Sequence, residues 1–177
     1  RVTAAARRHA HLGCIPGVAL DLTSTDDEGN VWNFDIAAMR DKAERLIDEQ
    51  QPELLVGSPM CTAFSNLQNL NNAKRDPAVV AREKEAGRRH LEWRCHLYRK
   101  QIARGAYFLH EHPNGASSWK LSCVKSVLSW PGVQRIRGDQ CQFGQRARDG
   151  RPVQKGTGFM TNSALLATEL ARLCRGH

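Results

Sequence analysis

The sequence has no apolar run near the roughly 20 residues that a membrane-spanning helix needs, and no secretory signal at its start. It also has no repeat, no low-complexity tract and no linker, so nothing divides its 177 residues into separate domains. We therefore expect one domain over residues 1–177 and no membrane partner. Because the chain begins at Arg1 without an initiating Met, we expect the N-terminal part of this domain to be missing.

Cysteines at close spacing are absent as well. The six cysteines are irregularly spaced and include no Cys-x-x-Cys pair, which argues against both a zinc ribbon and a disulfide framework. The pairs His9/His11 and His110/His112 fit no common zinc-binding spacing, so we expect no metal site. These features favour a reduced, intracellular protein of the nucleus or cytoplasm.

The charge of the chain is strongly positive. Lys and Arg exceed Asp and Glu by eight, whereas the 41% hydrophobic and 25% charged residues are typical of a globular protein. Such an excess favours a polyanionic partner, of which nucleic acid is the first candidate. The segment 82–104 alone has eight Lys or Arg against three Glu. These charged side chains either contact phosphate groups or form a solvent-exposed face of a helix.

The apolar pattern alternates between two periods. Short apolar runs predict strands at 17–22, 54–58, 106–110, 133–138 and 158–161. Apolar residues three and four positions apart predict helices at 2–11, 36–50, 77–105 and 122–130, followed by a last helix with Leu166, Leu170 and Leu173 on one face. This alternation predicts an α/β fold in which helices cover both faces of a mostly parallel sheet. In such folds, sites form at the carboxyl ends of the strands.

One loop has the features of a nucleophile site. Cys61 follows a predicted buried strand and shares its loop with Pro59 and polar neighbours. A cysteine held there, partly exposed and close to loop amides, can act as a thiolate nucleophile. The alternative is a buried cysteine with a purely structural role.

This loop resembles the nucleophile motif of DNA cytosine-C5 methyltransferases, Gly-x-Pro-Pro-Cys-Gln-x-Phe-Ser. The matching positions are Gly57, Pro59, Cys61, Phe64 and Ser65. Met60 and Thr62 replace the Pro and the Gln that flank the family's nucleophile. The first change leaves the loop less stiff, and the second removes an amide contact near the flipped base.

A second segment resembles the family's Glu-Asn-Val motif, which likewise follows a hydrophobic strand. Glu111 takes the place of the catalytic acid, while His112 and Pro113 replace the Asn and the Val. We expect the Glu111 carboxyl group to lie just past the end of its strand. By itself, a Glu at this position favours the alternative, a solvated or salt-bridged side chain.

The resemblance implies a reaction. The Cys61 thiolate would attack carbon 6 of cytosine, and Glu111 would supply a proton at nitrogen 3. Carbon 5 would then take a methyl group from S-adenosyl-L-methionine. The base must be flipped out of a duplex or already single-stranded, because its reacting atoms are unreachable inside the stack. The resemblance further implies a Rossmann-like doubly wound sheet of the S-adenosylmethionine-dependent methyltransferase type, missing its first strand, and favours DNA over RNA.

The resemblance also implies cofactor contacts. Asp21, at the end of a predicted strand, would bind the ribose, and Asp35 would lie near the adenine amino group. Pro59 and Asn162 complete this set, Asn162 in a strand-to-helix turn like the family's last motif. The alternatives are a turn residue for Asp21 and a helix N-cap for Asp35. The glycine-rich donor loop, expected before the helix that begins near Val2, is missing.

About 45 residues separate Pro113 from Phe159, which leaves little room for the family's target-recognition region. The stretches 139–144 and 155–160 resemble those of phage-type and retroelement-encoded versions of the family. Two other functions stay open. One is a nucleic-acid-binding module of a mobile element that has lost the donor site. The other is a hydrolase that uses Cys61 with His110 or His112.

Overall fold

The computed structural model describes residues 2–65, 68 and 71–176. By internal contacts the chain divides into two compact units, Arg1–Pro52 and Glu53–His177. The single domain expected over residues 1–177 spans both units and stays a prediction. Among the described residues, no helix has the length and the apolar character needed to cross a membrane.

The described residues of the first unit form two α-helices. Helix α1 (Val2–Arg8) is followed by the short helix η1 (Ala10–Leu12), and α2 (Ala37–Gln50) ends where Gln51 adopts a left-handed conformation with φ of 43°. A loop precedes α2, and two of its carboxylates form ion pairs with Lys42 of that helix: Asp26 at 2.9 Å and Asp27 at 2.8 Å.

The strand predicted at 17–22 is wrong. Residues 14–20 form no regular element, and the chain then turns through 21–23. The side chains of Val18 and Leu22 are more than half exposed, so this apolar run has no buried face to stabilise a strand. A short apolar run indicates a strand only where a neighbouring strand can pair with it.

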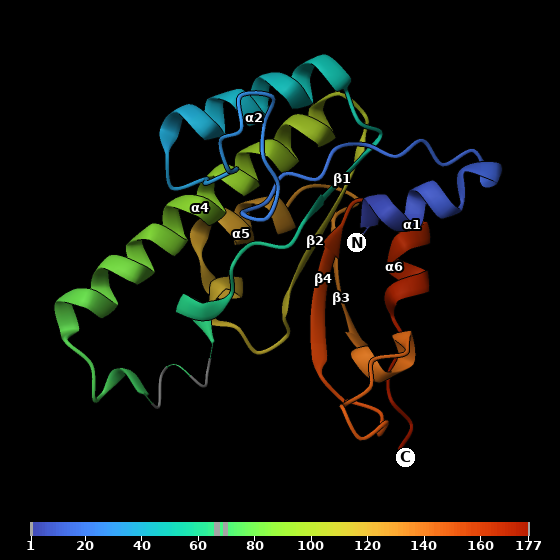
Figure 1. Cartoon of the computed structure of the whole chain (residues 1–177). Coiled ribbons are helices and arrows are strands. Elements are labelled where there is room, and N and C mark those ends of the chain that lie inside the picture. The colour runs from blue at the N-terminus through green and yellow to red at the C-terminus, as the bar shows by residue number, and fades with distance from the viewer. Residues whose placement is uncertain (1, 66–67, 69–70, 177) are drawn as a thin grey trace. The chain divides into compact units, whose positions relative to one another are not determined.

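The second unit is built on a four-stranded sheet with the order β1-β2-β4-β3 (Figure 1). Its strands are β1 (Leu54–Gly57), β2 (Tyr107–Pro113), β3 (Gln134–Asp139) and β4 (Gly156–Thr161). Only β1 and β2 are parallel, because β4 runs antiparallel to both β2 and β3. The α/β class is thus confirmed, whereas the described residues do not form the expected mostly parallel, doubly wound sheet. The physical reason is the connection from β3 to β4, which has no crossover helix and therefore reverses the chain.

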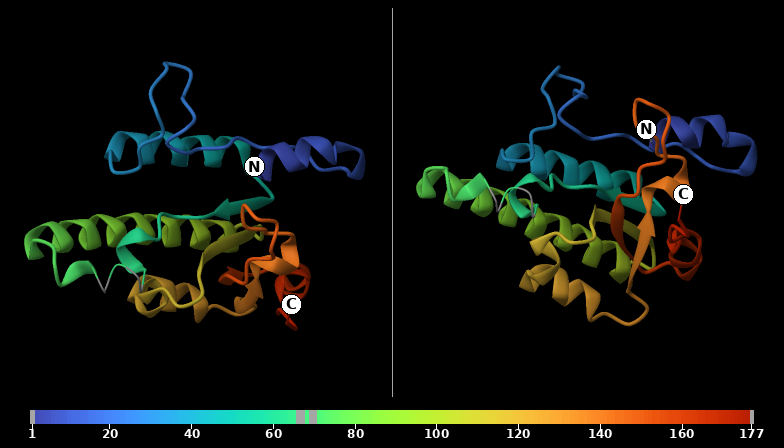
Figure 2. Two further views of the ribbon diagram at one scale, coloured as in Figure 1. Left: turned by 60° about the horizontal axis from the view of Figure 1, so that its bottom comes forward. Right: turned by 90° about the horizontal axis from the view of Figure 1, so that it is seen from below.

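Helices lie on both faces of this sheet. Helix α4 (Pro77–Ala103) begins at the N-cap Asp76, whose carboxylate accepts a hydrogen bond from the Ala78 amide at 2.8 Å. It connects β1 to β2 and packs against both strands and against α5 (Ser122–Leu128). Helix α6 (Ala164–Leu170) packs against β3 and β4 on the other face (Figures 1 and 2).

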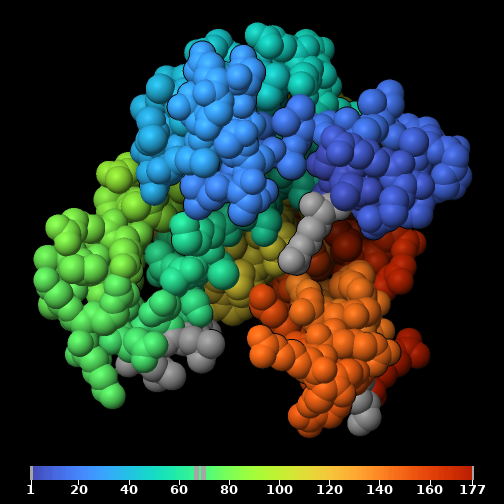
Figure 3. Space-filling view, viewed as in Figure 1, coloured from blue at the N-terminus to red at the C-terminus, as the bar shows by residue number. Residues whose placement is uncertain are grey.

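The connection between β3 and β4, residues 140–155, is a basic surface segment. It begins with the short helix η4 (Gln140–Phe143), and residues 142–151 are all exposed. Figure 3 shows this part of the chain, in orange, at the surface. Its charged side chains are Arg146, Arg148, Asp149, Arg151 and Lys155, so the segment is positively charged.

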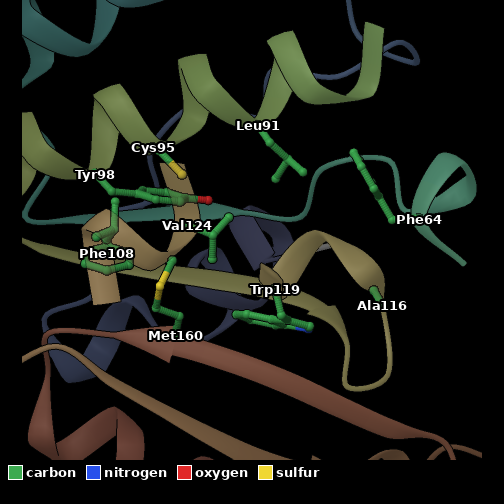
Figure 4. Close-up of a cluster of buried hydrophobic side chains, with 10 residues drawn as sticks. Phe64, Leu91, Cys95, Tyr98, Phe108, Ala116, Trp119, Val124 and Met160 are labelled. Carbon is green, nitrogen blue, oxygen red and sulfur yellow. The ribbon is translucent and has the colours of Figure 1, made fainter. Parts of the chain in front are cut away.

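The core of the second unit lies between α4, α5 and one face of the sheet (Figure 4). The rings of Tyr98 and Phe108 stack with centroids 4.6 Å apart, and Val124 and Met160 belong to the same cluster. All four side chains are fully buried, and each large apolar side chain of this kind contributes about 1.5–3 kcal/mol. This cluster holds α4 firmly against β2.

Most predicted elements are confirmed. The helices predicted at 36–50, 77–105 and 122–130, and the strands at 54–58, 133–138 and 158–161, each match an observed element within about two residues. The first predicted helix is split into α1 and η1, and the last ends at Leu170, before Leu173. Strand β2 runs three residues beyond its predicted end.

Candidate functional site

The loop after β1 holds Cys61 in a half-buried position. Cys61 is the N-cap of the short helix η2 (Thr62–Phe64), and its carbonyl accepts a hydrogen bond from the Phe64 amide at 3.0 Å. The buried Phe64 ring lies against Gly87 of α4, so closely that a Cβ at that position would be 3.0 Å from a ring carbon. This contact anchors the loop, in which Cys61 as a residue is half-buried.

Glu111 lies inside β2 and not past its end, so that detail of the prediction is wrong. Its backbone pairs with Phe159 of β4, which extends the strand beyond the length that the apolar run suggested. On its other side, Gly57 of the parallel strand β1 pairs with His110, and Ser58 therefore comes beside Glu111. The Ser58 hydroxyl donates a hydrogen bond to Oε2 of Glu111 at 2.5 Å.

The structure thus joins the two motifs that the sequence singled out. Ser58 belongs to the same loop as Cys61, only three residues earlier, and its hydrogen bond connects this loop to the carboxylate of Glu111. Sequence reasoning missed Ser58, which occupies the variable position of the nucleophile motif. The register of two parallel strands, and not a motif, identifies it.

Two histidines alternate with Glu111 along β2 and are buried in the core. Nδ1 of His110 lies 3.0 Å from the Tyr98 hydroxyl, and Nδ1 of His112 lies 2.6 Å from the Ser118 hydroxyl. Their ring centroids are 5.5 Å apart, and both rings pack edge-on against Trp119. Within the described part of the chain, the buried Nε2 atom of His110 has no hydrogen-bond partner.

Burial controls the protonation of this pair. It lowers the pKa of His110 to about 3, and the charges of His112 and Arg94 act in the same direction. Burial also lowers the pKa of His112, although Glu111 and the backbone carbonyls of residues 59–60 oppose this effect. Both rings are neutral near pH 7. The carbonyls place the His112 ring next to the loop that precedes Cys61.

The fold requires a glycine at position 57 for a steric reason. A Cβ at this position would lie 2.0 Å from the hydroxyl oxygen of Tyr98, which is fully buried. Burial also raises the pKa of Tyr98, so its hydroxyl keeps its proton beside His110. Only a residue without a side chain lets β1 approach α4 this closely. The apolar spacing that predicted the helix at 77–105 gave no sign of this contact.

The two acidic cofactor candidates belong to the first unit. Asp21 does not end a strand; it lies in an exposed turn, where its Oδ1 accepts hydrogen bonds from the amide (2.7 Å) and the hydroxyl (2.6 Å) of Thr23. These hydrogen bonds lower the pKa of Asp21. Asp35 is also exposed, and its amide donates to the Asn33 side chain at 3.0 Å. Ile36, not Asp35, is the N-cap of α2.

The other two candidates belong to the second unit. Pro59 is buried in the loop after β1. Asn162 follows β4, and both polar atoms of its side chain form hydrogen bonds. Oδ1 accepts a hydrogen bond from the Phe108 amide, and Nδ2 donates one to the Ala106 carbonyl, each at 2.9 Å. Asn162 therefore holds the beginning of β2, whereas Glu111 lies near the end of this strand. A cofactor role for these four residues stays a prediction.

The basic segment 140–155 leaves the sheet at the same end as the Cys61 loop. Pro113 at the end of β2 pairs with Thr157, and the amide of Asn114 donates to the Gly156 carbonyl at 3.1 Å. The end of β2, the end of its parallel neighbour β1 and the start of β4 therefore lie at the same end of the sheet. The positively charged segment and the Cys61 loop therefore lie at the same end of the sheet.

Within the described ranges 2–65, 68 and 71–176, no group of three or more His, Cys, Asp or Glu side chains could hold a metal ion. Comparisons with known proteins give no relative: no family model, no curated protein and no solved structure matches this chain. The resemblance to DNA cytosine-C5 methyltransferases therefore rests on the motifs around Cys61 and Glu111.

Proposed function

We propose that this chain transfers a methyl group to carbon 5 of cytosine in nucleic acid, with DNA favoured over RNA, through a covalent adduct at Cys61. The observation that carries this proposal is the hydrogen bond from Ser58 to Glu111, which couples the nucleophile loop to the carboxyl group of the neighbouring strand. A thiol and a carboxyl group held at the same end of the sheet are the two protein groups that this reaction needs.

The chemistry assigns one task to each group. Addition of the Cys61 thiolate to carbon 6, with a proton given by Glu111 to nitrogen 3, converts the ring to an enamine with an electron-rich carbon 5. After methylation, a water molecule takes the proton from carbon 5, nitrogen 3 returns its proton to Glu111, and departure of the Cys61 thiolate restores the aromatic base. Ser58 would keep the Glu111 carboxyl group oriented toward the base. Such proton transfer by a positioned group accelerates reactions by about 10²–10⁴-fold.

S-adenosyl-L-methionine is the proposed donor and would supply an electrophilic methyl group. The predicted contacts fit it only in part. Both ends of the Asn162 amide are bonded to backbone groups, and Thr23 occupies Oδ1 of Asp21. This observation supports the second candidate function, a nucleic-acid-binding module without a working donor site.

The burial of the histidines argues against the third candidate, a cysteine hydrolase. Such an enzyme needs a histidine that accepts the proton of Cys61 near neutral pH. A base with a pKa of about 3, as His110 has, accepts protons poorly. Nδ1 of His112 is bonded to Ser118, and burial lowers the pKa of His112 as well.

A trapping experiment tests the proposal. The full chain is incubated with S-adenosyl-L-methionine and a single-stranded or mismatched DNA that contains 5-fluorocytosine. Fluorine at carbon 5 blocks the final elimination, so the adduct survives denaturing electrophoresis. We expect a DNA adduct with the unaltered chain and with Cys14→Ala, an exposed cysteine that serves as control, but none with Cys61→Ala.

Two further measurements separate the candidates. DNA binding that all three chains share, without any adduct, would replace methyl transfer by the binding module. Calorimetric titration with S-adenosyl-L-methionine, repeated with Asp21→Ala, tests the donor site independently of DNA. Ester hydrolysis without nucleic acid, lost in Cys61→Ala, would establish the hydrolase instead.

A further inference from the structure

The connection between β3 and β4 is longer than its geometry requires. These strands are antiparallel neighbours, which a turn of about two to five residues usually joins, yet residues 140–155 lie between them. Part of this connection is itself ordered, because Arg146 and Pro152 form an antiparallel bridge with backbone hydrogen bonds of 2.8 and 3.0 Å on either side. Residues 145–153 therefore form a hairpin, which we call the basic hairpin (orange in Figure 1).

The basic hairpin and its base carry positive charge that the chain does not compensate. The connection 140–155 has four Lys or Arg against one Asp. Asp149 forms an ion pair with Arg151 at 2.7 Å. Among the described residues, neither Arg148, at the turn of the hairpin, nor Lys155, at its base, forms an ion pair, and both residues are exposed. These two charges are therefore available to a polyanion.

The longer run of positive charge on α4 is different. Its Arg88 forms ion pairs with both Glu85 and Glu92, which lie one turn before and one turn after it. The charge of residues 82–104, which the sequence also suggested as phosphate contacts, is thus partly neutralised within the helix itself. This difference makes α4 an internal control for the basic hairpin.

An exposed aromatic ring lies just before the basic hairpin. Phe143, the last residue of η4, is 42% exposed. Its ring packs edge-on against Phe159 of β4, with centroids 6.2 Å apart. A Cβ at Gly138 of β3 would lie 3.0 Å from a carbon of the same ring, so the ring is held against two strands. A fixed ring that is open to solvent beside positive charge is the arrangement on which bases of single-stranded nucleic acids stack.

This ring lies on the same face of the sheet as Glu111. Glu111 and Phe159 are register partners on adjacent strands, so their side chains point to the same side, and Phe143 packs against Phe159. Lys155 comes four residues before Phe159, which is roughly 14 Å along the chain at about 3.4 Å per residue. About four stacked nucleotides, at about 3.4 Å each, cover this length.

We propose that the basic hairpin and Phe143 bind a single-stranded nucleic acid. Arg148 and Lys155 contact its phosphate groups, and one base stacks on the Phe143 ring. A single strand is favoured over a duplex, because a side chain can stack on a base only where that base has left its own stack. As the surface that holds the substrate of Cys61, this assignment rests on the proposed function; binding itself needs neither Cys61 nor a methyl donor.

Salt-dependent binding tests the phosphate contacts. The full chain is titrated into a fluorescein-labelled, cytosine-containing single-stranded DNA at several NaCl concentrations, without S-adenosyl-L-methionine, and anisotropy is measured. The double variant Arg148→Ala/Lys155→Ala should bind about tenfold more weakly. The slope of log K against log salt should become shallower by about 1.4, since each phosphate contact with a single strand contributes about 0.7. Arg82→Ala/Lys84→Ala, an equally charged and exposed pair on α4, should keep both values.

The same titration tests the stacking contact. Phe143→Leu keeps an apolar side chain against Phe159 but removes the aromatic face, so binding should weaken about fivefold or more. The salt slope should stay unchanged, because no charge is lost. Phe143→Tyr, which restores an aromatic ring, should recover the affinity. Circular dichroism should show the same fold for all variants.

A measurement on the unaltered chain keeps the proposal testable even if a variant fails to fold. Lysines are acetylated with and without the single-stranded DNA and mapped by mass spectrometry. We expect the DNA to protect Lys155 but not Lys84. The proposal is overturned if Lys155 stays unprotected, if the α4 variant loses as much affinity as the hairpin variant, or if folded Phe143→Leu binds as tightly as the unaltered chain.

The trapping experiment separates this inference from methyl transfer. Weaker binding by the hairpin variant, together with no 5-fluorocytosine adduct in the unaltered chain, would remove methyl transfer and keep the binding surface. An adduct that the hairpin variant forms at the full rate, with unchanged binding, would keep methyl transfer and remove the binding surface.

Discussion

The two faces of strand β2 differ sharply, although they alternate residue by residue. On one face Phe108, His110 and His112 are buried among α4, α5 and Trp119. On the other face Leu109 and Glu111 are only half-buried, and Glu111 receives its hydrogen bond from the loop of Cys61. One strand thus anchors the fold with one set of side chains and presents a reactive group with the other.

The comparison also shows what polar groups do in each place. The core-face histidines are neutral and bonded through Nδ1, and Nε2 of His110 is left without a partner among the described residues. Such a buried polar atom costs about 1–3 kcal/mol. The opposite face of β2, which we call the open face, carries the half-buried carboxyl group of Glu111, which solvent and substrate could reach. We therefore expect core-face changes to alter stability and open-face changes to alter reactivity.

The largest effect is expected on the open face, at Glu111. Glu111→Gln removes the proposed proton donor, so the rate of adduct formation with 5-fluorocytosine DNA should fall about 10²–10³-fold. Circular dichroism should show an unchanged fold. Glu53→Gln, an exposed carboxyl group just before β1, is the control and should keep the full rate. An unchanged rate in Glu111→Gln would remove Glu111 from the proposed site.

The next effect concerns the core behind β1. Gly57→Ala places a methyl group against the Tyr98 hydroxyl and should lower the free energy of unfolding by about 1–3 kcal/mol. In a double-mutant cycle, Tyr98→Phe should recover part of this loss, because it removes the nearest atom. Gly17→Ala, in open space, should leave urea unfolding unchanged. Additive effects of the first two changes would show that the close contact is absent.

The pH dependence of stability reports on the core face. In the unfolded chain His110 takes up a proton near its ordinary pKa of 6.5, whereas the buried ring does so only near pH 3. Unfolding therefore takes up a proton in this window. The free energy of unfolding should fall by up to about 1.4 kcal/mol per pH unit for this group as pH falls from 6.5 to 3.

Urea unfolding at several pH values checks this expectation. His110→Gln should show a shallower slope than the unaltered chain, whereas His96→Gln, at an exposed position of α4, should not. Equal slopes for all three chains would mean that His110 is not buried in its neutral form.

The smallest effect is expected at Ser58. Ser58→Ala removes one hydrogen bond to Glu111, and a contribution of about 0.5–1.5 kcal/mol corresponds to a fall in adduct formation of about two- to thirteenfold. Stability should hardly change, because this side chain lies on the exposed loop. Ser126→Ala on α5 is the matched control. A large loss of stability in Ser58→Ala would contradict the expectation that changes near the open face of β2 alter reactivity and not stability.

Local elements were predictable because their signals are local. The apolar spacing of α2 and α4, the proline at the first turn of α4 and the apolar run of β1 each lie within a few residues of what they specify. The same reasoning failed at 17–22, where the run is apolar but has no strand to pair with. It also ended β2 too early, since pairing with β4 extends this strand through polar residues.

By itself, the sequence determined the α/β class, the long helix between β1 and β2, and the candidates Cys61 and Glu111. Only the tertiary structure decided the antiparallel position of β4, the hydrogen bond between Ser58 and Glu111, and the burial of His110 and His112. The physical reason is distance along the chain. Helical periodicity is a property of neighbouring residues, whereas strand partners, hydrogen bonds and pKa values depend on groups that folding brings together from segments far apart.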